Sequence, residues 1–198
     1  GKIVSVQIGS EVREYPAGIS YEEVAKDYQE RMTHKIVLAW ADGRLRELQN
    51  CVDSDCYLSF LTTADKIGFQ TYRRSMVHLL MKAVYHEGGH ENIERVGVHF
   101  AVSGGVYCTV KGSLVPDEEF LKQVKGYMRH LVEERIPIRK KSVNTDDAIM
   151  LFQKYGMKDK EKLFRYRRVS RVNIYSIDDF EDYYYGFMVP NTSYLQYF

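Results

Sequence analysis

Two predicted β-hairpins flank a single predicted helix within the first 62 residues. Polar and apolar residues alternate over 3–8 and 12–15, and Gly9-Ser10 supplies the turn between these runs. The dipeptide Asp42-Gly43, typical of two-residue hairpin turns, separates the apolar run 36–40 from the run 45–48. One more strand is expected over 57–61. A helix between two hairpins restricts this part of the chain to a small domain that contains both helix and sheet.

The predicted helix begins at a capping signal. Ser20 and Glu23 have capping-box spacing, so each side chain can bond the free backbone N–H of the other. One face of the helix is then apolar, with Tyr21, Val24, Ala25, Tyr28 and Met32. The order of hairpin, helix, hairpin and strand predicts a β-grasp, ubiquitin-like domain over residues 1–62.

The rest of the chain, over 65–198, predicts a larger α/β domain, so the whole is expected to be of the α+β class. Helices are expected over 69–85, 117–135 and 145–155. Strands are expected over 97–102, 105–110, 136–143, 169–177 and near the end. The strand over 136–143 is interpreted as an edge strand, and Gly88-Gly89 is expected to end the first of these helices.

The balance of charges limits the kinds of partner. Lysine and arginine number 28, aspartate and glutamate number 27, and the formal net charge is +1, which argues against a polybasic arm or an acidic tail. No apolar run reaches about 18 residues, which argues against a membrane span or a signal peptide. Cys51, Cys56 and Cys108 lack CxxC spacing, so a reducing, cytoplasmic location is expected. The uncharged end at 194–198 predicts a fragment of a longer protein.

Three stretches carry a resemblance to a known family. Residues 72–80 read YRRSMVHLL, the predicted helix after Pro116 leads to Ile136-Pro137-Ile138, and residues 182–192 read DYYYGFMVPNT. These stretches resemble the N-terminal half of threonyl-tRNA synthetases, in which a TGS domain precedes an editing-type domain shared with alanyl-tRNA synthetases. In that family the first stretch carries His-x-x-x-His, and the last carries Cys-x-x-x-His before Val-Pro-Asn-Thr. The resemblance implies a TGS domain over 1–62 and an editing-like domain over 65–198.

The four site positions of the family correspond to Arg74, His78, Tyr184 and Met188, and only His78 keeps the family's residue. Zinc takes neutral imidazole, thiolate or carboxylate ligands, which a guanidinium or a thioether cannot replace. The resemblance therefore implies a pocket that is retained as a fold but has no metal, no catalytic residues and no hydrolysis of mischarged tRNA. These four residues form the predicted ligand-binding site.

Paired TGS and synthetase-like domains also precede the P-loop domain of bacterial uridine kinase-family nucleoside kinases, and segment 182–198 resembles those proteins most. The chain contains no Gly-x-x-x-x-Gly-Lys-[Ser/Thr], so phosphotransfer with ATP and Mg²⁺ would belong to a transferase domain after Phe198. The leading hypothesis is a non-catalytic, ligand-sensing or RNA-contacting region of a nucleoside kinase, with no cofactor of its own. Its expected partners are a nucleotide or tRNA, the kinase domain in cis and a second copy of the chain.

Two interpretations remain for the residues of this predicted site. Arg74 and His78 lie one helical turn apart, either as the wall of a vestigial pocket that binds phosphate or carboxylate, or as a solvated helix face. Tyr184 either stacks on a base or ribose, or packs in a core or interface. If residues 183–185 lie on a strand, Tyr184 faces away from Tyr183 and Tyr185.

Three further interpretations are considered as alternatives. The sequence His86-Glu87-Gly88-Gly89-His90 matches His-Glu-x-x-His of metalloproteases, but each glycine costs about 1 kcal/mol inside a helix, which favours a helix end. An active editing hydrolase of mischarged tRNA would need replacement ligands such as His86, His90 or His99. The third hypothesis is a structural module that docks a partner through the edge of the first sheet.

Two basic runs are candidates for RNA contact. One comprises Arg165, Arg167, Arg168 and Arg171, with Tyr166 available to stack on a base. The other covers 139–141. The balanced total charge favours the alternative that these residues form a solvated charged face.

Overall fold

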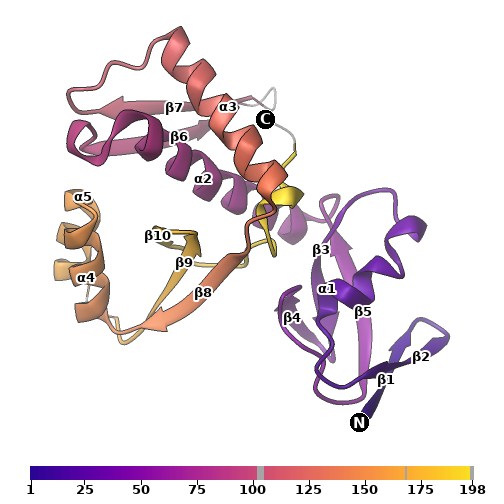
Figure 1. Ribbon diagram of the computed structural model, residues 1–198. Helices are drawn as coiled ribbons and strands as arrows, with labels where there is room; N and C mark the ends of the chain where they lie inside the picture. The colour runs from indigo at the N-terminus through magenta and orange to yellow at the C-terminus, as the bar shows by residue number, and fades with distance from the viewer. Residues whose placement is uncertain (102–104, 168, 197–198) are drawn as a thin grey trace. The chain divides into compact units, whose positions relative to one another are not determined.

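The computed structural model describes residues 1–101, 105–167 and 169–196. It divides into two compact units, of which the first contains Gly1–Ser75 and Gly186–Pro190 and the second contains Met76–Tyr185 and residues from Asn191 onward. Both units contain helices and sheets (Figure 1), in agreement with the predicted α+β class. By packing, the first ten residues of helix α2 (Lys66–Gly88) belong to the first unit, beyond the boundary expected at 62–65.

Five strands form the sheet of the first unit, in the order β2-β1-β5-β3-β4. They are β1 (Ile3–Ile8), β2 (Glu11–Pro16), β3 (Ile36–Ala41), β4 (Arg44–Glu47) and β5 (Cys56–Thr62). The strands β1 and β5 are parallel, whereas the other neighbours are antiparallel. Both predicted hairpins are confirmed. Asp42 and Gly43 have φ angles of 50° and 81°, the positive values that a tight hairpin turn requires.

The helix of the first unit is shorter than predicted. Helix α1 covers Tyr21–Lys26 and is followed by the 3₁₀ turn η1 (Gln29–Arg31). The Ser20 hydroxyl accepts the Glu23 N–H at 3.1 Å, which confirms the cap, but the Glu23 carboxylate pairs with Lys26 at 2.7 Å. Met32 is 37% exposed and lies outside the helix. The apolar face of the helix therefore ends at Ala25, and Tyr28, although buried, follows outside the helix.

Helix α2 is buried around most of its circumference in its second half. Residues on opposite sides of the helix, including His78, Leu79, Met81, Ala83 and Tyr85, are all less than 9% exposed. The interpretation of the Arg74–His78 side as a solvated face is therefore wrong for His78. Phe69, an apolar residue near the start of the helix, is 48% exposed. Gly88 ends the helix, as predicted, and Gly89 follows with a φ of 82°.

At Gly68, the start of α2 lies very close to the end of β5. A Cβ atom at this position would lie 2.0 Å from the carbonyl oxygen of Thr62. We expect Gly68→Ala to destabilise the first unit by about 1–3 kcal/mol, although alanine is intrinsically the better helix former. Urea unfolding followed by the fluorescence of Trp40, the single tryptophan, measures this change.

A matched glycine tests whether the effect is steric. Gly126 lies in helix α3 (Glu118–Glu134), and a Cβ atom there would meet no atom within 4 Å. Gly126→Ala should therefore stabilise its unit by about 0.5–1 kcal/mol. Stabilisation by both substitutions would contradict the close approach at Gly68.

The second unit contains a two-stranded and a three-stranded antiparallel sheet. The first pairs β6 (Arg95–Phe100) with β7 (Val106–Lys111), and its predicted turn at Ser103-Gly104 lies outside the described residues. The second has the order β10-β9-β8, from β8 (Ile138–Val143), β9 (Val172–Ile177) and β10 (Phe180–Tyr183). The expected edge strand is thus confirmed as β8.

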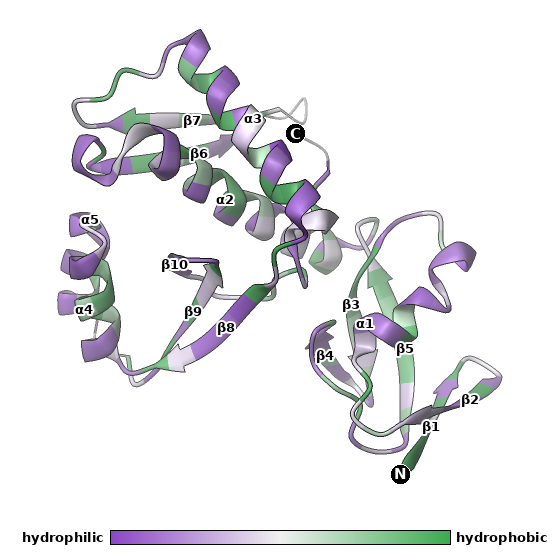
Figure 2. Ribbon diagram, in the orientation of Figure 1, coloured by the Kyte–Doolittle hydropathy of each residue, from purple (hydrophilic) through white to green (hydrophobic). Residues whose placement is uncertain are grey.

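Helices α3, α4 (Thr145–Lys154) and α5 (Lys158–Tyr166) complete the second unit with the 3₁₀ turns η2 (His90–Asn92) and η3 (Thr192–Tyr194). Asp117 and Asn144 cap α3 and α4. Figure 2 shows hydrophilic and hydrophobic residues alternating along α3, and Leu121 on this helix is 41% exposed. Among the helices of the described ranges, none combines the length and apolar character that a membrane span requires.

Candidate functional site

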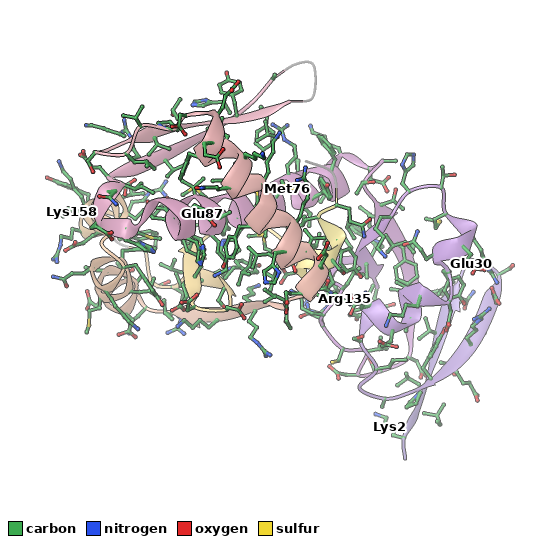
Figure 3. The ribbon with its side chains drawn as sticks, turned by 45° about the horizontal axis from the view of Figure 1, so that its top comes forward. Lys2, Glu30, Met76, Glu87, Arg135 and Lys158 are labelled. Carbon is green, nitrogen blue, oxygen red and sulfur yellow. The ribbon has the colours of Figure 1, made fainter. Side chains whose placement is uncertain are left out.

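A buried imidazole lies in the second unit. His78, on α2, is fully buried, and its Nδ1 atom lies 3.1 Å from the hydroxyl of Tyr184. The ring of Tyr184 meets the imidazole edge-on with centroids 5.0 Å apart, and Phe180 contributes a second ring contact at 5.4 Å. Figure 3 labels Met76 and Glu87, which lie on either side of His78 in the sequence of α2. The structure thus brings together two of the four predicted site residues.

The surroundings keep both groups neutral near pH 7. Burial lowers the pKa of His78 to about 3, and the positive charges of Lys160 and Lys82 contribute further. Burial also raises the pKa of Tyr184 well above its usual range. An imidazole with so low a pKa is a weak base, and a phenol with so high a pKa is a weak acid. The pair is therefore suited to a neutral hydrogen bond and not to proton transfer.

A hollow of about 390 Å³ lies beside this pair, within the second unit. Aliphatic side chains from α2 and β6 line one part, and Tyr183 at the end of β10 lines another together with the two tyrosines that follow it. Its lining residues are Val77, Met81, Val96, Val98, Lys160, Asp182, Tyr183, Tyr184 and Tyr185. We call it the editing-type hollow, after the editing-type domain that the resemblance implies over 65–198. It combines apolar walls with a small polar region, as ligand sites commonly do.

The polar region of the editing-type hollow is a buried ion pair. Lys160 from α5 pairs with Asp182 from β10, and their side chains are 14% and 3% exposed. The other oxygen of Asp182 accepts the Tyr183 N–H at 2.8 Å. Burial raises the pKa of Asp182, whereas the ammonium of Lys160 opposes this rise. A buried pair of this kind offers both a donor and an acceptor to a ligand.

Sequence reasoning did not identify Lys160 or Asp182 as site residues. Asp182 belongs to the quoted stretch 182–192, yet the comparison with the family's four positions gives it no role. Helix α5 is not among the predicted helices, because its sequence KDKEKLFRY is strongly charged and contributes only Phe164 to the core. A signal that could have found Lys160 is its spacing four residues before Phe164, which places both on one helical face.

The three consecutive tyrosines make different ring contacts. The ring of Tyr183 packs against Phe152 and Phe164 at centroid distances of 5.8 and 4.7 Å, whereas Tyr184 turns to His78. Tyr185 contacts Tyr183, and its hydroxyl accepts a hydrogen bond from Arg167 at 3.3 Å. The strand β10 ends at Tyr183, so the expected strand over 183–185 is not formed, and all three tyrosines line the same hollow. Tyr184 packs against His78, and its stacking on a base stays a prediction.

The other two predicted site residues belong to the first unit. The Arg74 guanidinium donates to the carbonyl oxygen of Phe187 at 2.8 Å and lies against Gly186, where a Cβ atom would meet its Cζ at 2.3 Å. Met188 is fully buried, its sulfur lies 3.3 Å from the Ser75 hydroxyl, and its N–H donates to the Glu47 carboxylate at 2.8 Å. Arg74 and Met188 thus fix the segment 186–190, and a ligand-binding role for them stays a prediction.

The residues at these positions do not suit a zinc ion. One imidazole, a phenol, a guanidinium and a thioether lack the set of neutral nitrogen, thiolate and carboxylate ligands that zinc takes. Across the described residues, no group of three histidine, cysteine, aspartate or glutamate side chains is placed to hold a metal. The His86–His90 motif lacks the continuous helix that a metalloprotease needs, because α2 ends at Gly88. The ring of His86 stacks on Tyr127 at 3.9 Å, and the ring of His90 stacks on Tyr85 at 4.6 Å.

The arginines proposed for RNA contact have intramolecular partners. Arg165 bonds Glu161 one turn earlier in α5, and Arg171 bonds the Ser142 hydroxyl and carbonyl oxygens. Arg167 bonds the hydroxyl of Tyr185 and lies over its ring. Arg168 lies outside the described residues. RNA contact by these arginines stays a prediction.

The fold and the site define an α+β chain of two units, with a partly buried polar hollow in the second. No family model matches the chain. The chain is similar to threonine–tRNA ligases of Thermotoga petrophila and Francisella tularensis subsp. novicida, each 28% identical over 94% of this chain. It covers only 28% and 29% of the lengths of these relatives. The similarity supports the resemblance to a threonyl-tRNA synthetase-like region, and nothing in it concerns a uridine kinase.

Proposed function

We propose that this chain is a threonyl-tRNA synthetase-like region in which a TGS-type β-grasp unit precedes an editing-type unit that binds a small ligand without hydrolysing it. The observation that carries the binding role is the editing-type hollow, with the buried Lys160–Asp182 pair in its wall. The sheet order of the first unit and the position of α1 between its hairpins support the β-grasp assignment.

The lining of the hollow indicates the class of ligand. Its aliphatic and tyrosine walls suit a planar ring, whereas Lys160 and Asp182 can bond hydroxyl, amino or carbonyl groups. A nucleoside, free or at the end of a tRNA, contains both kinds of group. The neutral state of His78 and Tyr184 favours binding over hydrolysis, because neither group exchanges a proton readily near pH 7.

A steric block tests this proposal. Val98 lines the hollow, whereas Val106 on the neighbouring strand β7 is 41% exposed and does not line it. We expect adenosine or uridine to shift ¹H–¹⁵N NMR signals around the hollow, and Val98→Trp to abolish those shifts. Val106→Trp is the matched control and should leave them intact. Absence of shifts with both nucleosides, or equal binding by the two variants, would contradict the proposal.

An editing hydrolase is the second candidate, favoured by the similarity to threonine–tRNA ligases over 94% of the chain. We expect the purified chain to leave mischarged aminoacyl-tRNA at its spontaneous rate of hydrolysis, and to contain no stoichiometric zinc by elemental analysis. Hydrolysis that Val98→Trp abolishes and Val106→Trp retains would establish the editing activity in place of the binding role. Stoichiometric zinc would contradict the ligand argument made for His78, Tyr184, Arg74 and Met188.

We also propose that this region belongs to a nucleoside kinase. A nucleoside kinase domain after Phe198 would carry the P-loop, ATP and Mg²⁺, and this region would then sense a ligand on its behalf. Reading the gene beyond Phe198 tests it, because a Gly-x-x-x-x-Gly-Lys-[Ser/Thr] motif is either present in the next domain or absent.

A further inference from the structure

Helix α1 lies over one face of the sheet of the first unit (Figure 1). Contact between Tyr28 and Phe60 marks the covered face. On the opposite face, the register aligns Val12, Gln7 and Tyr57 across β2, β1 and β5. It likewise aligns Ser59, Trp40 and Leu45 across β5, β3 and β4. Because side chains alternate along a strand, these residues point away from α1.

Large apolar side chains remain exposed on this face. Ile3 is 53% exposed, Val12 59%, Trp40 43% and Tyr57 67%. We call the surface that these four residues define the open sheet face. Leu38, on the same side of β3 as Trp40, is fully buried, and its neighbour Glu47 bonds the Met188 N–H. This face is therefore packed near Leu38 and exposed elsewhere. Exposed apolar patches commonly mark interaction sites.

The charges of the open sheet face all have one sign. The alternation of side chains directs Arg13, Arg44 and Arg46 to the α1 side, because their partners across the strands are Val6, Ala41 and Ala39. The outward positions of the five strands include Glu14 on β2 but no lysine or arginine. Asp42 and Asp55 add two carboxylates at the strand ends. The face is thus apolar and anionic.

Two carboxylates line a hollow of about 230 Å³ on this face. Its lining residues are Ser5, Gln7, Val12, Asp42, Asp55, Cys56 and Tyr57. Asp42 accepts the Tyr57 N–H at 2.9 Å, and Asp55 accepts the Ser5 N–H at 2.8 Å. Within the described residues, neither carboxylate makes an ion pair. Burial raises the pKa of Cys56, and the negative charges of Asp42 and Asp55 add to this rise.

We propose that the open sheet face docks an extended basic segment of a partner protein and that an arginine of this segment enters the hollow. A guanidinium can bond the two carboxylates through its planar fork and stack on the exposed ring of Tyr57. Apolar residues beside this arginine would cover Val12, Trp40 and Ile3. The charge of the face disfavours an RNA backbone, which carries the same sign. The inference does not depend on the editing-type hollow, which lies in the other unit.

Trp40 provides a direct readout, because it is the single tryptophan of the chain and lies on the open sheet face. The probe is a ten-residue peptide of alternating arginine and valine, and its control has glutamate in place of arginine. We expect the arginine peptide alone to change the Trp40 fluorescence in a saturable manner that weakens at high salt. No response to it, or an equal response to the glutamate peptide or to polyuridylate, would overturn the proposal.

Removal of the charges of Asp42 and Asp55 tests whether the arginine binds in this hollow. Asp42→Asn/Asp55→Asn keeps a side-chain oxygen to accept the Tyr57 and Ser5 N–H groups, and asparagine tolerates the positive φ of Asp42. We expect this variant to bind the arginine peptide at least about tenfold more weakly, because charge-assisted hydrogen bonds are about twice as strong as neutral ones.

A second double variant controls for the change in net charge. Glu30→Gln/Glu133→Gln removes two exposed carboxylates outside the open sheet face, one in η1 and one in α3 (Figure 3 labels Glu30). It should bind the peptide as the unmodified chain does. Equal affinities of the two double variants would overturn the assignment of the hollow, and ¹H–¹⁵N spectra establish that both are folded.

Discussion

Replacement of Lys160 by methionine should lower the free energy of unfolding of the second unit by about 3–5 kcal/mol, because it leaves the carboxylate of Asp182 buried without its partner. Asp182 is 2% exposed. Without Lys160, the hydrogen bond that the structure describes for its carboxylate comes from the Tyr183 N–H. Methionine preserves the packing of the lysine stem, so the loss reports on charge and not on volume. The decrease is measured by urea denaturation, followed through ¹H–¹⁵N NMR signals of β9. Trp40 cannot serve here, since it belongs to the first unit.

Two further variants isolate the cause. Lys160→Met/Asp182→Asn removes both charges and should recover most of the lost stability, because asparagine still accepts the Tyr183 N–H. Lys111→Met removes one partner of an exposed ion pair with Glu94, whose side chains are 64% and 56% exposed, and should cost less than about 1 kcal/mol. A loss at Lys160 no larger than that at Lys111 would show that the Lys160–Asp182 pair is not effectively buried.

Local signals account for the parts of the fold that were predicted correctly. The Asp42-Gly43 turn, the Ser20 cap and the Gly88-Gly89 stop each depend on residues within a few positions of one another. Such signals act on the backbone directly, through positive φ or a capped N–H, and need no knowledge of distant contacts. The two hairpins and most helix ends follow from them.

The burial of α2 and the polar pair of the editing-type hollow depend on distant contacts. Arg74 and His78 have the same spacing in the sequence whether their side of the helix is solvated or packed. Distant residues decide between these states, among them Tyr184, 106 residues after His78. Likewise, nothing local to Lys160 indicates that Asp182 will lie beside it. The resemblance to the synthetases predicts a site at His78 and Tyr184, because these residues occupy metal-binding positions of the family. Lys160 and Asp182 occupy none of these positions, so the resemblance does not predict them.

Acid should destabilise the second unit through His78. The unfolded imidazole binds a proton near pH 6.5, whereas the folded one binds it only near pH 3. Between these values the unfolded state holds the additional proton, so the free energy of unfolding falls as the pH falls, by up to about 1.4 kcal/mol per pH unit. The loss begins below about pH 6.5 and is complete near pH 3. Urea denaturation at successive pH values between 7 and 4, again followed through β9, measures it.

The difference between this chain and His78→Gln isolates the contribution of the imidazole. Glutamine does not titrate, and its amide can still bond the Tyr184 hydroxyl. The raised pKa of Asp182 has the opposite effect on acid stability, but it is common to both proteins and cancels in the difference. We therefore expect the stability curve of His78→Gln to be flatter between pH 6 and 4. Parallel curves would mean that His78 binds a proton at the same pH in the folded and unfolded states, so that burial does not lower the pKa of its imidazole.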